Sequence, residues 1–350
     1  MSKEAEMNAI DEAYIKLAER NGKANSPAML KILQCAMTPE EARFLLALPA
    51  PNAELASKFN MTEEAVEKKI RELARRGLVT ASRKGYRYPN DPSTLHDNIL
   101  SSAPQYIPAG MDKLWMELYE GEGWWREIAQ NLGLMGNQIL RVVPVLKSVP
   151  SGARMLPHEN VEEIIRAHKE LITVRNCCCR MGAKKCDHPV ETCTQFGRRA
   201  EYDLYRGSGR KVSAEEAIAI SMKAGEAGLV PTVANVSSIA ALEFICYCCG
   251  CACLVLNPTI RFGNVKQVLA PSRFLAKVDS RTCNGCGICV PLCFFNAIKM
   301  DKDRAVIDPE KCLGCGVCVL RCELKAITME QVRPPEFIPE TIAGPSTVVH

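Results

Sequence analysis

The sequence carries one cysteine-rich stretch twice near its C-terminal end. "CNGCGICVPLC" at 283–293 is followed by "CLGCGVCVLRC" at 312–322, with the same cysteine spacing. The repeat continues beyond the cysteines, since Ala297-Ile298 matches Ala326-Ile327 and Met300 matches Met329. The C-x2-C-x2-C-x3-C spacing lets three thiolates of one tight loop hold three corners of an iron–sulfur cubane. The eight thiols belong to Cys283, Cys286, Cys289, Cys293, Cys312, Cys315, Cys318 and Cys322.

These tandem runs resemble the bacterial dicluster ferredoxins over about residues 278–330. The resemblance implies a (βαβ)2 domain with two [4Fe–4S] clusters, in which the fourth cysteine of each run ligates the other cluster. One cluster would take Cys283, Cys286, Cys289 and Cys322, and the other Cys312, Cys315, Cys318 and Cys293. Phe294 and Glu323 replace the usual proline after each fourth cysteine, which affects the local turn or the potential but not the ligation. Zinc knuckles are the alternative, and four-cysteine runs in tandem disfavour it.

Ten further cysteines lie in two groups in the middle of the chain. "RNCCCRMGAKKCDHPVETC" covers 175–193 and "ICYCCGCACL" covers 245–254. Each group lies at the edge of an apolar segment, so the two loops could close one metal site between them. Ten thiols exceed the four of a single cubane, which indicates a larger cluster, two clusters, or a cluster beside a reactive thiol pair. The candidate ligands are Cys177, Cys179, Cys186, Cys193, Cys246, Cys248, Cys249, Cys251 and Cys253.

Several neighbours refine this prediction. Adjacent Cys248 and Cys249 cannot easily serve the same cubane, so at least one of them is expected not to be its ligand. His188 is a spare candidate ligand, although a loop histidine is more often an ordinary loop residue. Structural zinc and inert buried thiols are the alternative interpretations. Cations near the first group are expected to offset thiolate charge, namely Arg175, Arg180, Lys184 and Lys185.

The combination of the middle motifs with a following dicluster ferredoxin is similar to a family of large iron–sulfur proteins from anaerobes. These are described as 4Fe–4S ferredoxin-type domain proteins, and the similarity covers about residues 141–330. It implies metal binding and electron transfer with a partner oxidoreductase or electron carrier protein. It implies no defined substrate and no catalytic residues, so whether the chain is an enzyme stays open.

The N-terminal third resembles a winged helix-turn-helix. Short helical patterns precede "TEEAVEKKIRELARRG" at 62–77, and "LVTASRKGYRYPND" supplies two strands with a Lys84-Gly85 turn. The helix that would enter DNA starts with Glu63, Glu64 and Glu67, which have the wrong sign for phosphates. Arg83, Lys84 and Arg87 lie on the wing. A protein-contact or scaffold role is therefore favoured over DNA binding.

The bulk composition fits a soluble protein of several domains. The chain has 350 residues, 24% of them charged, and a net charge of +4, which is too small to argue for nucleic acid by itself. The N-terminus lacks the apolar core of a signal peptide, and Glu243 with Gly250 argues against a membrane span at 239–256. We therefore expect a cytoplasmic protein, whose thiols stay reduced and bind metal or react.

The predicted fold class is α+β and multidomain. The predicted parts are a helical N-terminus with a winged-helix-like domain (1–100), a helical linker region (101–150), a cysteine-rich α/β domain (151–277), the ferredoxin domain (278–330) and a Pro-rich tail (331–350). The predicted function is an iron–sulfur electron-transfer protein or subunit with two [4Fe–4S] clusters and a further Cys-rich site. No nucleotide-binding glycine motif is present. A redox-responsive winged-helix regulator, or a reductase acting at the ten-cysteine site, are the alternatives.

Overall fold

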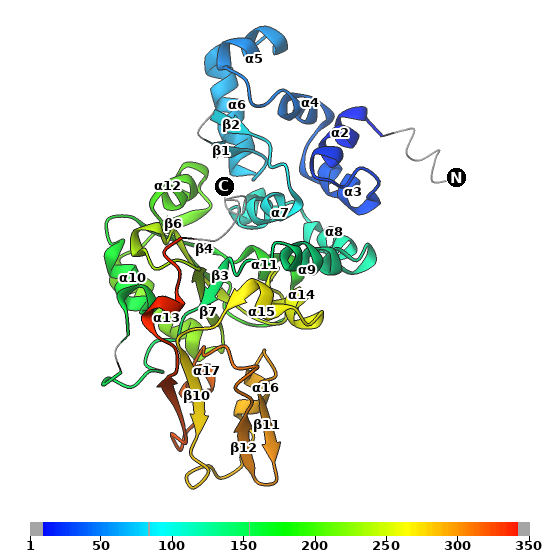
Figure 1. The fold of residues 1–350 in the computed structure, drawn as a ribbon. Coiled ribbons are helices and arrows are strands. Elements are labelled where there is room, and N and C mark those ends of the chain that lie inside the picture. Colours follow the sequence, from blue (N-terminus) through cyan, green and yellow to red (C-terminus); the bar gives the residue numbers. More distant parts are fainter. Residues whose placement is uncertain (1–9, 83–84, 154, 342–350) are drawn as a thin grey trace.

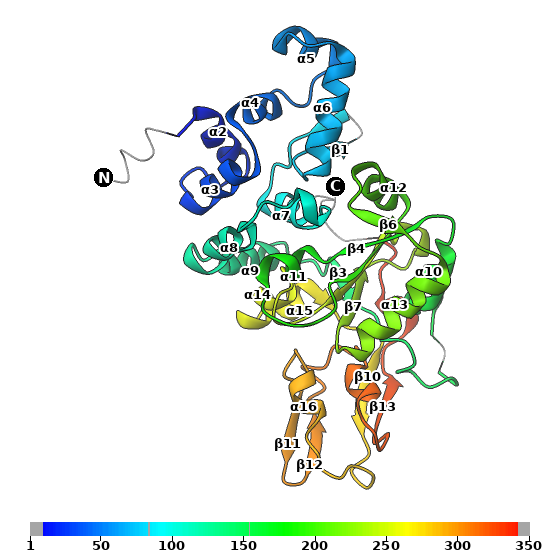
Figure 2. The same ribbon diagram turned by 180° about the vertical axis from the view of Figure 1, so that it is seen from behind.

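The computed structural model describes residues 10–82, 85–153 and 155–341. Three parts follow one another along the long axis of the molecule: N-terminal helices, a central mixed sheet, and a small β-rich domain at the opposite end (Figures 1 and 2). Arg83 and Lys84 of the predicted wing, and Pro345 of the predicted tail, lie outside the described residues.

The N-terminal part is built from capped helices. Ser26, Thr38 and Thr62 each accept a hydrogen bond from a backbone N–H in the first turn of the helix that follows, which satisfies donors that the helix cannot pair. The elements are α2 (Glu12–Arg20), α3 (Pro27–Ala36), α4 (Pro39–Leu46), α5 (Asn52–Phe59), α6 (Glu63–Arg75), β1 (Thr80–Ser82), β2 (Gly85–Arg87), α7 (Pro92–Leu100), η1 (Pro104–Tyr106), α8 (Met111–Met116), the π-helical turn η2 (Glu117–Gly121) and α9 (Trp124–Leu134).

The order of α4, α5, α6 and the antiparallel β1–β2 hairpin follows the expected winged-helix order, and the assignment itself stays a prediction. A single hydrophobic core runs from Ala13 to Ile128. Helices α8 and α9 share this core with α2–α7 in the described residues. The division at residue 100 therefore stays a prediction.

The central part is a seven-stranded sheet in the order β6-β4-β5-β8-β7-β3-β9. Because β3 belongs to this sheet, the part begins near residue 140, before the predicted boundary at 151. Its elements are β3 (Leu140–Val142), η3 (Pro157–Glu159), α10 (Val161–Ala167), β4 (Ile172–Asn176), α11 (Cys178–Ala183), β5 (Glu191–Phe196), α12 (Gly197–Arg206), β6 (Gly209–Lys211), α13 (Ala214–Glu226), β7 (Val230–Ala234), η4 (Ile239–Ala241), β8 (Phe244–Cys248), α14 (Leu256–Arg261), α15 (Val265–Val268) and β9 (Leu269–Ala270).

This sheet brings the two cysteine groups together. β5 lies between β4 and β8, with Arg175 opposite Cys193 on one side and Thr194 opposite Ile245 on the other. The cysteines that follow β4, lie in β5 and end β8 therefore meet at one region of the sheet, although 71 positions of sequence separate Cys177 from Cys248.

The C-terminal part has the order β-α-β twice, as predicted for the ferredoxin domain. The two repeats interlock, since β10 pairs with β13 and β11 with β12, both antiparallel. Strand β10 begins at Phe274, so this domain starts before residue 278. Its elements are β10 (Phe274–Val278), α16 (Cys289–Leu292), β11 (Ile298–Asp301), β12 (Arg304–Ile307), α17 (Val317–Leu320) and β13 (Ile327–Gln331), followed by η5 (Pro335–Phe337).

Specific contacts fix this domain to the central part. Arg273 and Glu159 form a fully buried ion pair, in which the Arg273 Nε donates to both carboxylate oxygens at 2.9 Å. The Val145 N–H donates to the Cys315 carbonyl at 2.9 Å, and the segment after β13 returns to the central part, where the Ser237 N–H donates to the Pro339 carbonyl at 2.8 Å. The described part of the predicted tail therefore packs back against the central part.

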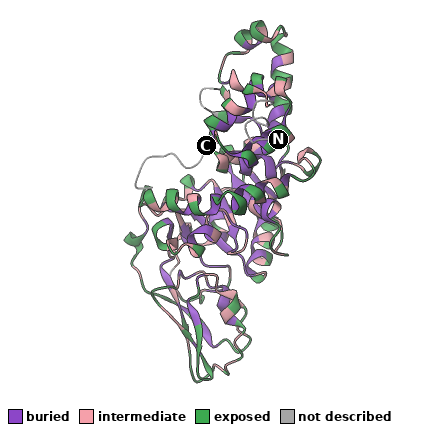
Figure 3. Ribbon diagram, turned by 90° about the vertical axis from the view of Figure 1, so that its right-hand side faces the viewer, coloured by how far each residue is buried: buried purple, intermediate pink, exposed green. Residues whose placement is uncertain are grey.

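Buried residues gather in the middle of the molecule, where the N-terminal helices meet the central part (Figure 3). Within the described residues, no helix combines the length and apolar character needed to cross a membrane.

Candidate metal centres

The second ferredoxin loop encloses a cavity. Its lining includes the thiols of Cys293, Cys312, Cys315 and Cys318, the set that the resemblance assigns to one cluster. The loop needs glycine at 314, because its φ is +68° and a Cβ there would lie 2.1 Å from the Phe274 carbonyl oxygen. Burial raises the pKa of Cys315 to about 12, so without a metal this enclosed thiol stays protonated.

The other predicted set lies nearer to solvent. Cys289 has Cys286, Cys283 and Cys322 as its neighbouring thiols, and Cys286 is exposed. Cys289 also interacts electrostatically with Cys318 of the enclosed set, so the two sets adjoin. We call them the outer set (Cys283, Cys286, Cys289, Cys322) and the inner set (Cys293, Cys312, Cys315, Cys318).

Six of the middle cysteines form a closed ring of interacting thiols. Each thiol interacts with its two neighbours in the order 177–193–246–248–253–179 and back to 177. Four members are buried and two are half-buried. We call Cys177, Cys179, Cys193, Cys246, Cys248 and Cys253 the thiol ring.

The other three predicted ligands lie elsewhere. The Cys186 Sγ lies 3.9 Å from the Cys249 Sγ, and both interact with Cys251. Alternation along β8 explains the split: Cys246 and Cys248 project to one side of the strand, and Cys249, one residue further on, belongs to a different group. The nine predicted ligands, for which the sequence leaves one larger site or two sites open, therefore fall into two groups of thiols in the structure.

Of the four predicted cations, Arg180 alone is directed at both groups. It is buried, its Nη1 donates to the Tyr247 carbonyl at 2.8 Å, and its charge acts on Cys177, Cys193 and Cys249. Hydrogen bonding from Cys251, with a smaller contribution from Arg180, lowers the pKa of Cys249 to about 6. Lys184 and Lys185 instead pair with Asp112 and Glu120, because α8 and η2 lie against this loop.

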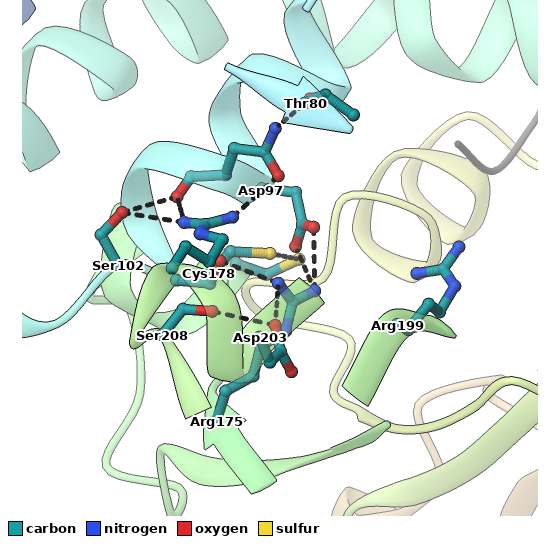
Figure 4. Close-up of polar contacts among 12 residues, drawn as sticks. Thr80, Asp97, Ser102, Arg175, Cys178, Arg199, Asp203 and Ser208 are labelled. Atoms are coloured by element: carbon teal, nitrogen blue, oxygen red, sulfur yellow. Dashed lines mark hydrogen bonds and ion pairs between the residues drawn. The ribbon is translucent and has the colours of Figure 1, made fainter. Parts of the chain in front are cut away.

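The fourth cation, Arg175, joins the thiol region to the N-terminal part (Figure 4). Its guanidinium donates to the Asp97 carboxylate at 2.8 Å and to the Ser101 Oγ at 2.9 Å, and it lies 3.6 Å from the Asp203 carboxylate. Burial would raise the pKa of Asp97, but Arg175 and a hydrogen bond from Cys178 hold it well below its usual range.

Cys178 is held outside the thiol ring. Contact with Cys179 favours its thiolate, yet burial and the Asp97 charge raise the pKa of Cys178 to about 12. The protonated thiol is thus the form that hydrogen-bonds to Asp97. Asp97 was not anticipated from the sequence, because no local motif marks a carboxylate eighty residues before the cysteine that it contacts.

Aromatic side chains of the N-terminal part exclude water from α11. Tyr119 stacks on Trp124 and Trp125, and His96 packs edge-on against Trp115. A Cβ on Gly182 would lie 2.8 Å from the His96 Nε2, so the glycine permits this close approach. Burial and the nearby thiols raise the pKa of Tyr119 well above its usual range. The buried residues of α11, among them Cys178 and Arg180, are thereby shielded from solvent, which strengthens electrostatic interactions there.

Phe294 joins the ferredoxin domain to the thiol group formed by Cys186, Cys249 and Cys251. A Cβ on Gly250 would lie 3.0 Å from the Phe294 ring, and that ring meets His188 edge-on with 6.2 Å between centroids. The side chain that replaces the usual proline therefore packs against Gly250, the residue that separates Cys249 from Cys251 in the sequence. The inner-set residues Cys293 and Cys315 also pack against the hydrophobic core that contains Cys248 and Cys253 of the thiol ring.

Comparison with known proteins places one segment. A family model described as a 4Fe-4S dicluster domain matches residues 282–326. The chain matches no curated protein and no solved structure. The protein is thus an iron–sulfur protein with an electron-transfer domain near its C-terminus. The matched segment contains all eight cysteines of the two runs, and the ten middle cysteines lie outside it.

Proposed function

We propose that this protein carries electrons between a partner oxidoreductase and a third iron–sulfur cluster in its own central part. The outer and inner sets each hold one [4Fe–4S] cluster, and the thiol ring supplies the ligands of the third. The observation that carries the proposal is the shared hydrophobic core, in which the inner-set residues Cys293 and Cys315 pack with Cys248 and Cys253 of the ring. The outer set, the inner set and the thiol ring thus form a row of cluster sites from the surface of the protein to its centre.

The partner is expected to dock at the outer end of the ferredoxin domain. Cys286 of the outer set is exposed there, and two exposed apolar side chains are its sequence neighbours: Ile288, between Cys286 and Cys289, and Leu324, just after Cys322. The thiol ring, by contrast, lies beneath the N-terminal helices. Electrons would therefore enter or leave through the outer cluster. The redox partner would be an oxidoreductase or electron carrier protein of the cytoplasm of an anaerobe.

Removing half of the ring should remove the third cluster. The variant Cys177→Ala/Cys193→Ala/Cys246→Ala leaves three ring thiols, fewer than a cubane takes, so iron should fall from about twelve to about eight atoms per chain. Cys178→Ala is the matched control and should keep about twelve, because that thiol faces Asp97. Iron and sulfide analysis of anaerobically purified protein measures both. Equal iron in the triple variant and the wild type would refute the proposed ring cluster.

The winged-helix-like segment is proposed to act as a scaffold within this molecule. Helix α12 packs against α6, the Arg71 guanidinium lies over the Tyr205 ring, and Tyr86 of the hairpin stacks on the same ring. These contacts occupy surfaces of α6 and of the wing. They support an internal contact role over DNA binding.

We therefore expect no salt-sensitive DNA binding by the holoprotein. The acidic start of α6 repels phosphates, and the packing of α12 obstructs the approach of a duplex. Fluorescence anisotropy with a labelled random duplex at low salt measures the binding. A dissociation constant that rises steeply with salt concentration would instead support the regulator.

A further inference from the structure

The three cysteines outside the ring have a histidine among them. The Cys186 and Cys251 thiols and a ring nitrogen of His188 all lie within 4.8 Å of one another. Cys249 lies outside this set but adjoins it, since its Sγ is 3.9 Å from the Cys186 Sγ and it interacts with Cys251. We call these four residues the Cys3His group. It combines a Cys-x-His segment after α11 with a Cys-x-Cys segment after β8.

The spacing suits a single metal ion. A tetrahedral ion with metal–sulfur distances of about 2.3 Å holds two sulfur ligands about 3.8 Å apart. The observed Cys186–Cys249 separation of 3.9 Å is close to that value. Three thiolates and one imidazole are also a common ligand set for structural zinc, which prefers tetrahedral sulfur and nitrogen coordination.

The surroundings orient the histidine as metal-ligating histidines are oriented. His188 hydrogen-bonds to the backbone of Ala227, and one of its ring nitrogens lies within 4.8 Å of the Cys186 and Cys251 thiols. Metal-ligating histidines commonly make such a second contact to the backbone. The edge-on Phe294 ring restricts the imidazole further. A zinc ion with three thiolates and a neutral imidazole would carry a net charge of about −1, and Arg180 lies close enough to act on Cys249.

We propose that Cys186, His188, Cys249 and Cys251 bind one zinc ion, separate from the cluster of the thiol ring. The ion does no redox chemistry; it ties the segment after α11 to the segment after β8. Both segments contact Phe294, through His188 on one side and Gly250 on the other. The zinc site thus holds the surface on which the inner ferredoxin loop packs.

Metal analysis of the full chain, purified anaerobically without added zinc, tests the proposal. Wild-type protein should hold one zinc per chain, His188→Ala should lose it, and His188→Cys should restore it as a four-thiolate site. His168→Ala is the matched control, because its imidazole stacks on Phe196 away from both thiol groups, and should keep the zinc. Zinc K-edge absorption of the wild type should show three sulfur ligands and one nitrogen ligand.

Iron measured in the same samples keeps this inference distinct from the proposed function. Iron should be the same in wild type and His188→Ala, which also shows that the variant is folded. Zinc absent from the wild type, or retained in His188→Ala, would overturn the zinc site whatever the iron content. Loss of iron in His188→Ala with no zinc in the wild type would assign the Cys3His group to a cluster.

Discussion

Replacing Arg273 by methionine is expected to destabilise the folded protein by about 3–5 kcal/mol. Arg273 and Glu159 are 1% and 2% exposed, and their side chains pair through several contacts of 2.8–2.9 Å. Methionine fills much of the same volume but leaves the Glu159 carboxylate charged and buried without its guanidinium. Because Glu159 lies in η3 and Arg273 precedes β10, the loss falls on the junction between the central part and the ferredoxin domain.

Arg210→Met is the matched control for this variant. Arg210 pairs with Glu191 and Glu216, yet all three side chains are nearly half exposed, and such pairs contribute about 0–1 kcal/mol. Denaturant unfolding of the anaerobic holoprotein, followed by circular dichroism, measures both variants. Equal midpoints for the two would show that the buried pair does not stabilise the junction.

Replacing Cys318 by alanine is expected to break the electron path at its middle. Cys318 lines the inner-set cavity and interacts with Cys289 of the outer set, so its loss removes the cluster between the surface and the thiol ring. Iron should fall by about four atoms per chain. Reduction of the ring cluster by a reduced small ferredoxin, followed by freeze-quench EPR, should become slow compared with the wild type.

Cys35→Ala serves as the control, because Cys35 packs against the N-terminal core and belongs to neither thiol group. It should retain both the iron content and the rate of the wild type. A ring cluster in Cys318→Ala that is reduced as fast as in the wild type would contradict the proposed path through the inner cluster.

The ferredoxin domain could be predicted from the sequence because its signal is local. Four cysteines within eleven residues define one loop, and the repeat at 312–322 defines the second, so no long-range pairing has to be known. Helix starts were predictable for the same reason: Thr62 caps α6 as expected. The sequence does not mark the start of β10 at Phe274, because this strand contains no cysteine and is recognised by its pairing with β13.

The arrangement of the middle cysteines could not be predicted in the same way. Which thiols share a site depends on β5 lying between β4 and β8, and this order is set by the whole sheet. The sequence indicates that Cys248 and Cys249 cannot easily serve the same cluster. It does not indicate that Cys186 and Cys251 lie beside Cys249. Phe294 did leave a signal, since it stands where the usual proline was expected, and the structure supplies its packing partner, Gly250.

We propose that the ferredoxin domain exchanges electrons with a further cluster in the thiol ring. Iron and acid-labile sulfide per chain, measured on anaerobically purified wild-type protein, show whether that cluster is present. We expect about twelve of each, eight in the ferredoxin domain and four in the ring. About eight of each would contradict it and would confine the redox chemistry to the ferredoxin domain.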